Sequence, residues 1–308
     1  MSNDHYVPQH YLRGWAHDEN EKKLYSYKLI EYTKKVVFGP ASIVSSSSKD
    51  NLYTISDGEN RAEFETSVMT SLVDTPGSQI IAKLRVEKLD NLIVPDLIKL
   101  ASYISILEAR HPDTIAKMTL SEQDVNEIFS GFENSHLGTE VATSDVKAFL
   151  LKIIASSGAA AAGMFAGWGH GAESKALLNR GWIEVDRNDR QGFICSNYPV
   201  GRYVEYEKES LFLTFPVSPN KALWLLPPKD YKQYINTTDS GRAATKTNIS
   251  KYIDIATLGR ATEAYSLVSD KDQFIEKHLG WAKRTPEGKW SAYIKMAMQD
   301  GNSVYPYS

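Results

Sequence analysis

Residues 180–228 contain four short runs rich in aromatic and β-branched residues. Glycine, proline, asparagine or aspartate bounds each of them, and the runs are RGWIEVDR (180–187), GFICSNYPV (192–200), LFLTFPVSP (211–219) and KALWLLPP (221–228). This composition is typical of β-strands, and the short spacing between the runs is typical of hairpins. The sequence therefore predicts a group of antiparallel strands after residue 180.

A second group of strands is expected near the N-terminus. LYSYKL (24–29) and TKKVVFG (33–39) indicate a hairpin, and NLYTIS (51–56) indicates a third short strand. Between them, SSSSKD (45–50) is polar and irregular, so we expect a loop there.

Helices are expected between and after the two strand groups. DGEN (57–60) has the residues of a helix start, and that helix is expected to yield at Asp74–Gly77 and to resume through residues 80–89. Apolar residues at helical spacing between Pro95 and Pro112 predict a helix over 94–112. Further helices are expected over 121–129, 144–165, 249–269 and 272–284.

The predicted fold class is therefore α+β, with short N-terminal strands, a central helical region, antiparallel strands after residue 180 and C-terminal helices. Both strand groups could join one sheet. We expect a single domain over residues 1–308, with a possible subdivision into 1–60, 61–175 and 176–308.

Composition narrows the class of protein. A hydrophobic content of 42% supports a sizeable core, and a formal charge of −3 gives no global basic field that would attract nucleic acid, although a local surface can still be basic. The single cysteine, Cys195, rules out an internal disulfide framework and a multi-cysteine zinc site. No secretory leader is apparent, and the apolar stretch 153–169 is too rich in small residues for a membrane span, so we expect a cytoplasmic protein without a membrane partner.

Several blocks of the chain are similar to one family. HYVPQHYLRGWA (5–16) resembles the HYVPQ-type signature of the bacterial family catalogued as "domain of unknown function 4238", with His10 in its variable place. NLYTI, the helix ending in ILEARHP that contains Arg110, WIEVDRNDRQGFICSNYPV and LTFPVSPNKALWLL resemble later blocks of that family in the same order. The resemblance spans nearly the whole chain.

The resemblance implies a bacterial cytosolic protein, and some members of the family look like single-gene antiviral defence proteins. One position departs from the family pattern. Where the family usually has Ser-Asp-Asn-Pro, this chain has Ser196-Asn197-Tyr198-Pro199. If that aspartate is a metal ligand or a base in relatives, Asn197 weakens a catalytic role for this position.

The N-terminal block carries the first candidate site residues. If a helix begins at residue 9, Gln9 and Arg13 share a face, while His5 precedes Pro8 in a segment biased to extended backbone. Imidazole, amide and guanidinium groups could bind and turn over a phosphodiester, because histidine moves protons near neutral pH and arginine binds phosphate with two hydrogen bonds. The alternative is that the aromatic residues of the block pack on the core and that His5 only satisfies a backbone group.

Two other segments complete the predicted site. Arg110 could act with His5, Gln9 and Arg13 as a catalytic anion clamp, or it could be an ordinary cation at a helix C-terminus. Ser196 and Asn197, together with His10, could bind substrate, although a strand end with Asn and Pro is most simply a turn.

The remaining motifs give weaker signals. GWGHG (167–171) lacks the lysine and serine or threonine of a phosphate loop and is most simply a helix end. No metal site is predicted, since the chain shows no H-x-x-x-H, no C-x-x-C and no tight carboxylate cluster. Cys195 is expected to be a small buried hydrophobe.

Two classes of function stay open. The first is a defence effector that acts on nucleic acid or nucleotides, as a nuclease or another phosphodiester-directed hydrolase. The second is a non-catalytic recognition protein that binds a phage component or a small ligand. The sequence specifies neither a cofactor nor an oligomeric state.

Overall fold

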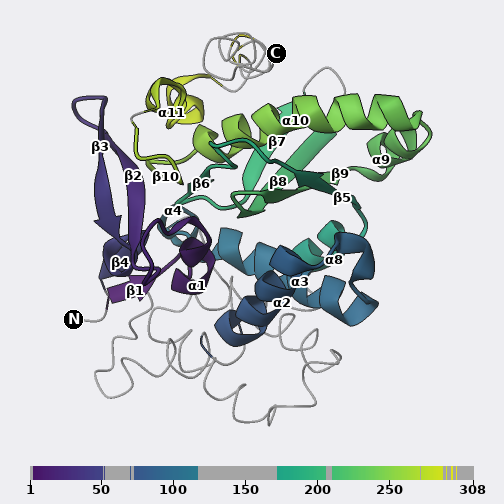
Figure 1. The fold of residues 1–308 in the computed structure, drawn as a ribbon, viewed down its shortest axis with the longest axis horizontal. Helices are drawn as coiled ribbons and strands as arrows, with labels where there is room; N and C mark the ends of the chain where they lie inside the picture. The colour runs from purple at the N-terminus through teal and green to yellow at the C-terminus, as the bar shows by residue number, and fades with distance from the viewer. Residues whose placement is uncertain are drawn as a thin grey trace. The chain divides into compact units, whose positions relative to one another are not determined.

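The computed structural model describes residues 3–50, 52, 70, 73–116, 172–205, 210–270, 272–286, 289, 293 and 296. The chain forms two compact units, and it passes between them three times. The first unit comprises residues 1–8 and 48–179, and the second comprises residues 9–47 and 180–308. Helices and antiparallel sheets occur together (Figure 1), so the predicted α+β class is confirmed. The single domain stays a prediction.

The first unit combines a two-stranded sheet with helices. Strand β1 (Asn3–His5) pairs antiparallel with β4 (Ser48–Asp50). The helices are α2 (Thr75–Val86), α3 (Val94–Ala109), α4 (Pro112–Ile115) and α8 (Ala172–Leu178), with the 3-10 turn η4 (Leu89–Asn91) between α2 and α3. Helix α3 contacts both α2 and α8.

Helix α3 is buried along most of its length. From Leu100 to Leu107 every residue is buried, as the apolar stripe in the sequence predicts. Gly77 of α2 lies directly against the ring of Tyr103, where any side chain would collide with it. A salt bridge of 2.6 Å between Lys83 and Asp96 also links α2 to α3.

The second unit contains two four-stranded antiparallel sheets. One has the strand order β3-β2-β10-β6 and the other has the order β5-β9-β8-β7. Strands of the first sheet are β2 (Lys23–Ile30), β3 (Lys35–Ser42), β6 (Cys195–Ser196) and β10 (Glu263–Ser266). Those of the second are β5 (Gly181–Asp186), β7 (Gly201–Glu205), β8 (Ser210–Ser218) and β9 (Lys221–Leu226). Through β10, one strand of the later group, β6, joins the sheet of the N-terminal hairpin.

Helices of the second unit supply its core. They are α1 (Gln9–Leu12), η1 (Arg13–Trp15), η2 (Ile43–Ser45), α9 (Pro228–Ile235), α10 (Asp239–Gly259), α11 (Gln273–His278) and α12 (Trp281–Arg284). Side chains of α10, α11 and α12 pack with Tyr27, Leu29, Ile194 and Ala264 in one buried cluster. One sheet face therefore packs these apolar residues against the C-terminal helices, and Glu263 and Tyr265, which alternate with Ala264, lie on the other face.

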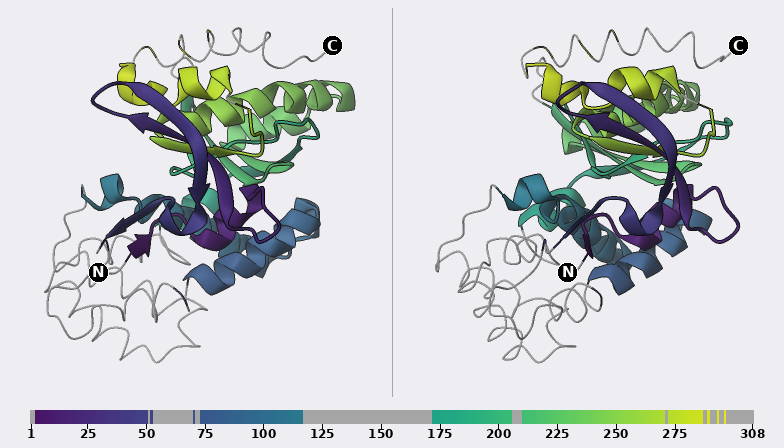
Figure 2. Two further views of the ribbon diagram at one scale, coloured as in Figure 1. Left: turned by 60° about the vertical axis from the view of Figure 1, so that its left-hand side comes forward. Right: turned by 90° about the vertical axis from the view of Figure 1, so that its left-hand side faces the viewer.

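The β2–β3 hairpin is longer than the strands beside it. Strand β10 pairs only with Tyr25–Lys28 of β2, so the last residues of β2 and the loop that follows extend past it. In both views of Figure 2 the dark purple hairpin runs well beyond the short strands of its sheet.

A buried ion pair ties β5 to helix α10. Arg187 follows β5, and its Nη1 lies 2.5 Å from Oδ2 of Asp254, a carboxylate with no exposed surface. Arg187 also donates through Nε to Asp189, and the main-chain N–H of Ile194 donates to the other oxygen of Asp254 at 3.1 Å. Both ions are thus compensated where water does not reach them.

Several sequence-based predictions need correction. Residues 48–50 form β4 and not a loop, because β1 supplies a partner strand that local composition cannot reveal. The helix expected over 249–269 ends at Gly259, and residues 263–266 form β10 between β2 and β6. The helix expected over 272–284 is two short helices, since Gly280 takes a positive φ of 72°.

Other predictions agree with the structure or lie outside it. The hairpin, the helix from residue 94 and the strands at 181–186, 210–218 and 221–226 are confirmed, whereas the run 192–200 contains only the two-residue β6. Helix α2 begins within Asp74–Gly77, where the earlier helix was expected to yield. The predicted third strand except for Leu52, the helix start at 57–60, the helices over 121–129 and 144–165, and GWGHG lie outside the described residues.

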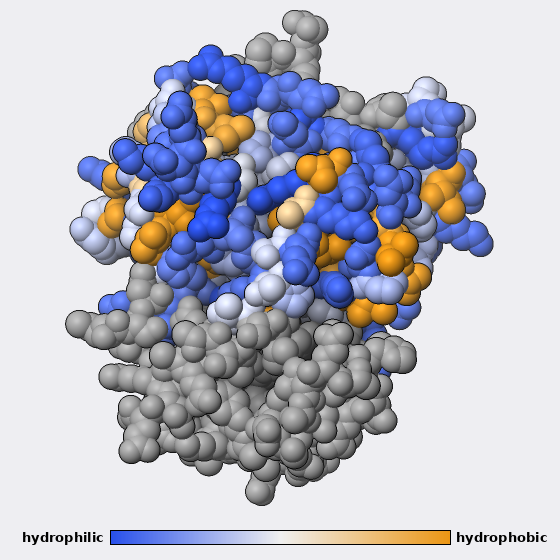
Figure 3. All heavy atoms as spheres, turned by 60° about the horizontal axis from the view of Figure 1, so that its bottom comes forward, coloured by the Kyte–Doolittle hydropathy of each residue, from blue (hydrophilic) through white to orange (hydrophobic). Residues whose placement is uncertain are grey.

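Among the described residues, no helix is long and apolar enough to cross a bilayer. Figure 3 shows that hydrophilic residues cover most of the described surface on one face, and that hydrophobic residues form several separate patches there.

Tyr27 of β2 makes unfolding sensitive to alkaline pH. Its hydroxyl donates to the main-chain oxygen of Asp270 and accepts from the N–H of Asp272, and burial, reinforced by the nearby Asp272 carboxylate, raises its pKa from 10.0 to about 12. Because the folded-state pKa exceeds that of the unfolded chain, the stabilisation is fully present below pH 10 and is lost as pH rises to about 12. This loss corresponds to about 2–3 kcal/mol.

We expect Tyr27→Phe to be less stable than the parent at neutral pH, and its free energy of unfolding to fall less between pH 10 and about 12. Urea unfolding at a series of pH values measures both effects. Tyr32→Phe, at an exposed position, is the matched control and should follow the parent curve. Parallel curves for Tyr27→Phe and the parent would show that Tyr27 does not titrate in this way.

Candidate functional site

Two predicted site residues, His5 and Arg110, lie in the first unit, and the side chain of Arg110 contacts the main chain of His5. Arg110, which follows α3, is almost completely buried; its Nη2 donates to the main-chain oxygen of His5, and its Nη1 lies 2.8 Å from Oδ1 of Asp74. The guanidinium thus joins β1 to the residue before α2. The contact uses the main chain of His5 and not its imidazole, which is consistent with a structural anchor, and the catalytic roles of His5 and Arg110 stay predictions.

Tyr6 and His111 pack beside this anchor. Their rings meet edge to face, with centroids 5.0 Å apart, and Nδ1 of His111 accepts the N–H of Asp113 at the start of α4. Tyr6 and Val7 are buried, which agrees with the packing alternative for this part of the N-terminal block.

Gln9, His10 and Arg13 lie in the second unit, on the turn formed by α1 and η1. The other face of this turn is fixed in place, because Tyr11 donates to the main-chain oxygen of Pro216 at 2.6 Å and Trp15 donates to that of Phe193 at 2.7 Å. Gln9 and His10 are half-buried and Arg13 is exposed. The expected helix start at residue 9 is confirmed, whereas the catalytic role of Gln9 and Arg13 stays a prediction.

Ser196 and Asn197 also belong to the second unit, and both are buried. Oγ of Ser196 accepts the N–H of Tyr198 and lies 3.0 Å from the main-chain oxygen of Thr257. Oδ1 of Asn197 accepts the N–H groups of Thr262 and Glu263 at 3.0 and 3.1 Å, and its Nδ2 donates to Oγ1 of Thr262 at 3.0 Å. Asn197 therefore fixes the turn that leads from α10 into β10.

This geometry explains how either residue type can stand at position 197. An aspartate could accept the same two N–H groups with one oxygen, and the hydroxyl of Thr262 could turn to donate to the other. The hydrogen bonds of the Asn197 amide are consistent with a structural role, which needs neither a base nor a metal ligand at this position.

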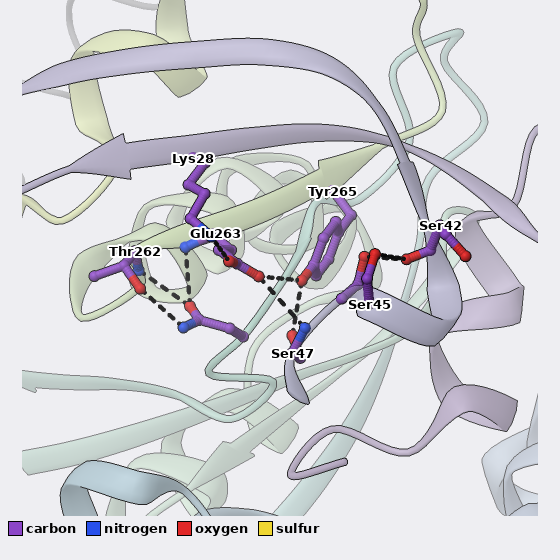
Figure 4. A network of polar contacts seen from close by, with 9 residues as sticks. Lys28, Ser42, Ser45, Ser47, Thr262, Glu263 and Tyr265 are labelled. Carbon is purple, nitrogen blue, oxygen red and sulfur yellow. Dashed lines mark hydrogen bonds and ion pairs between the residues drawn. The ribbon is translucent and has the colours of Figure 1, made fainter. Parts of the chain in front are cut away.

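A polar network that the sequence analysis missed is centred on Glu263, the residue after Thr262. Its Oε1 lies 3.0 Å from Nζ of Lys28, and its Oε2 accepts the hydroxyl of Tyr265 at 2.8 Å and the N–H of Ser47 at 3.4 Å. Oγ of Ser47 lies 2.7 Å from the Tyr265 hydroxyl. Figure 4 shows the Glu263 carboxylate between Lys28 and Tyr265.

The direction of these hydrogen bonds follows from their chemistry. A carboxylate only accepts, so Tyr265 donates to Glu263 and the Ser47 hydroxyl donates to Tyr265. Strand register places Glu263 opposite Lys28 and Tyr265 opposite Ser26, on the sheet face that the C-terminal helices do not cover. The network thus runs from a buried serine to an ammonium group that is 62% exposed.

The local sequence explains the position of Ser47. Ser45 and Ser46 both hydrogen-bond through their hydroxyls to the main-chain oxygen of Ser42, which tightens the turn η2. Ser47 then adopts a left-handed φ of 49°, which costs a non-glycine residue about 1 kcal/mol. Its two bonds to Tyr265 and Glu263 offset this cost.

The exposed part of this face is the β2–β3 hairpin. Lys34 and Lys35 are exposed, as are Tyr32, at 89%, and Val37, which lies opposite Lys28. The hairpin from Lys23 to Ser42 contains four lysines and one glutamate, a formal charge of +3, whereas the whole chain carries −3. We define the basic hairpin as Lys23–Ser42. It is a local basic surface on an acidic protein.

Within the described residues, no group of three or more His, Cys, Asp or Glu side chains is arranged to bind a metal ion. Cys195 is buried in β6, as predicted. The basic hairpin and the polar network of Glu263 are therefore our candidate ligand-binding surface. They provide positive charge, hydroxyl groups and an exposed aromatic ring.

Comparison with known proteins gives one match. The family model described as "Protein of unknown function (DUF4238)" matches residues 3–265. No curated protein and no solved structure matches the chain.

Proposed function

Because the chain belongs to the DUF4238 family, we propose that it is a bacterial, cytoplasmic antiviral defence effector that acts on nucleic acid or nucleotides. The defence context comes from the resemblance of the chain to proteins of that kind. We infer nucleic acid or nucleotides as the ligand from the basic hairpin, because its lysines can contact phosphates.

The backbone of Lys34 supports this assignment. Lys34 has a φ of 57°, in the left-handed region where glycine or asparagine is favoured and where another residue costs about 1 kcal/mol. A lysine in such a position brings charge to the hairpin at the expense of stability. Conformational cost of this kind is found more often where a side chain is needed for binding.

Lys34→Gly separates the two effects. We expect it to raise the melting temperature, because it relieves the left-handed backbone, and to weaken binding of an oligonucleotide about fivefold at 0.1 M salt, because one phosphate contact is lost. Fluorescence anisotropy with labelled oligonucleotides at several salt concentrations measures the affinity, and calorimetry measures the melting temperature. The slope of log K against log[salt] should also become shallower by about 0.7 for a single strand.

The control is Lys229→Gln, which removes an exposed lysine from α9 in the same unit and should leave the affinity within the error of the measurement. Equal losses in both variants would indicate a response to net charge alone. Failure of the parent protein to bind any oligonucleotide or nucleotide would refute the proposed ligand class.

A non-catalytic recognition protein is the second candidate, and the contacts of three predicted site residues favour it. The polar side-chain groups of Arg110, Ser196 and Asn197 hydrogen-bond within the fold, which is what structural residues do. Incubation with labelled RNA and DNA distinguishes the two functions: binding without cleavage supports recognition. Cleavage that is lost in a His5→Ala variant with a normal melting temperature supports the effector.

A further inference from the structure

We infer that the loop at the tip of the basic hairpin, Glu31–Lys34, binds single-stranded nucleic acid by stacking an unpaired base on the ring of Tyr32. This inference rests on the proposed function, since it names the form of nucleic acid that the same hairpin would bind. It is carried by the exposure of Tyr32, the rigidity of the loop and the lysines around it.

Tyr32 presents its ring to solvent. It is 89% exposed, the largest exposed fraction among the large hydrophobic residues that the structure describes as exposed. An aromatic ring in this position gives the hairpin no packing energy in the folded protein. Its two faces are therefore open to a planar ligand.

The loop that carries Tyr32 is fixed by its own hydrogen bonds. The N–H of Lys34 donates to the main-chain oxygen of Ile30 at 2.8 Å, and Oγ1 of Thr33 lies 3.4 Å from the same oxygen while accepting the N–H of Lys35 at 3.3 Å. The base of the loop is anchored as well, because Leu29 is buried in the cluster formed with α10, α11 and α12. Because the loop backbone is already ordered, binding restricts only the two side-chain torsions of Tyr32.

The charges around Tyr32 favour a polyanion. Lys34 and Lys35 are two and three positions after Tyr32, and both are exposed. Lys28 lies on β2, and although it pairs with Glu263 its ammonium group is 62% exposed. The one acidic residue of the hairpin, Glu31, lies 3.4 Å from Nζ of Lys283, which offsets its charge. Positive charge beside an exposed aromatic ring is the combination with which proteins bind single strands.

Stacking selects the single strand over the duplex. In a duplex each base is covered on both faces by its neighbours, and opening a step costs a few kcal/mol. An unpaired base has a free face for Tyr32, and every base offers one, so little sequence preference is expected. Single strands of DNA and of RNA should bind equally well, because neither base stacking nor phosphate contact distinguishes the 2′-hydroxyl.

The test compares three variants of Tyr32 in the full chain with an oligothymidylate, an oligouridylate of equal length and a DNA duplex. We expect Tyr32→Ala to weaken binding of both single strands about 10- to 100-fold, since one stacked base is lost, without a change in the salt slope. Tyr32→Phe keeps the ring and should bind as the parent does. Tyr32→Trp should lose indole fluorescence when a single strand binds and should keep it with the duplex.

The Tyr32 side chain is exposed, so all three variants should melt as the parent does, and the melting temperature serves as the folding control. If Tyr32→Ala binds as well as the parent while Lys34→Gly still weakens binding, the stacking inference is overturned and the proposed ligand class survives. Tighter binding of the duplex than of either single strand also overturns it. Absence of binding by the parent overturns the proposed function itself. A strong preference for one of the two single strands would also contradict the inference, since it would require a contact other than stacking and phosphate binding.

Discussion

Replacing Asp254 with alanine lowers the free energy of unfolding by about 3–5 kcal/mol, because the buried guanidinium of Arg187 loses its fully buried carboxylate partner and keeps only the partly exposed Asp189. The main-chain N–H of Ile194 loses its acceptor in the same substitution. Urea unfolding followed by tryptophan fluorescence measures the change. Five of the six tryptophans lie in the unit that contains this pair, so the signal reports on the right part of the chain.

The same substitution at Asp270 is the matched control. Asp270 and its partner Arg190 are both more than 80% exposed and lie 3.7 Å apart, so Asp270→Ala should change the free energy of unfolding by less than about 0.5 kcal/mol. The double variant Arg187→Met, Asp254→Leu should be more stable than Asp254→Ala, since no buried charge is left alone. A loss below about 1 kcal/mol for Asp254→Ala would contradict a buried and compensated pair.

Arg110→Met is expected to destabilise the first unit by about 2–4 kcal/mol, because the main-chain oxygen of His5 loses its charged donor and Asp74 loses its partner. Hydrogen exchange of the α3 amides measures this effect where it occurs, as a loss of protection. The exposed residue Lys99, on the same helix, provides the control variant Lys99→Met, which should leave exchange unchanged.

This variant also decides between the two interpretations of Arg110 that the sequence allows. If Arg110 is a structural anchor, a double-mutant cycle with Asp74→Asn will show coupling in the free energy of unfolding. Arg110→Met will then lower stability, and the protein that remains folded will still bind nucleic acid. A folded Arg110→Met protein with unchanged exchange but no activity would instead support the catalytic anion clamp.

The parts of the fold that could be predicted are those in which the pattern is local. The β2–β3 hairpin alternates over two adjacent runs, and α3 has an apolar stripe with Pro95 near its start and Pro112 three positions after its last residue. In both cases neighbours in the sequence are neighbours in space. The strands β8 and β9 were predictable for the same reason, because a two-residue turn connects them.

The errors occurred where the partner is distant in the sequence. Strand β4 exists because β1 pairs with it, and β10 exists because it fits between β2 and β6. Only residues 260–262 separate the long helix α10 from β10, and Gly259 is the one local residue that favours a helix end. A helical continuation through β10 was therefore the natural interpretation of the sequence, and it was wrong.

The same limit applies to the site. The hydroxyls of Ser47 and Tyr265 meet although 218 positions separate them, and the partners of Asn197 lie 65 and 66 positions away. Sequence reasoning found Asn197 from the family pattern but could not find Glu263 or Ser47, because a lone glutamate and one serine among four carry no signal. The charge of the basic hairpin was visible in the sequence, yet only the exposure of its side chains makes it a candidate surface.

The pairing of β2 with β10 has a consequence for synthesis on the ribosome. At about 5–20 residues per second, the ribosome needs roughly 10–50 seconds after making Ile30 before it reaches Glu263. During that interval the nascent β2–β3 hairpin has an open strand edge, which can pair with the edges of other chains. The lysines of the hairpin repel a second copy of the same edge, so the charge proposed to attract a ligand would also protect the newborn chain from aggregation.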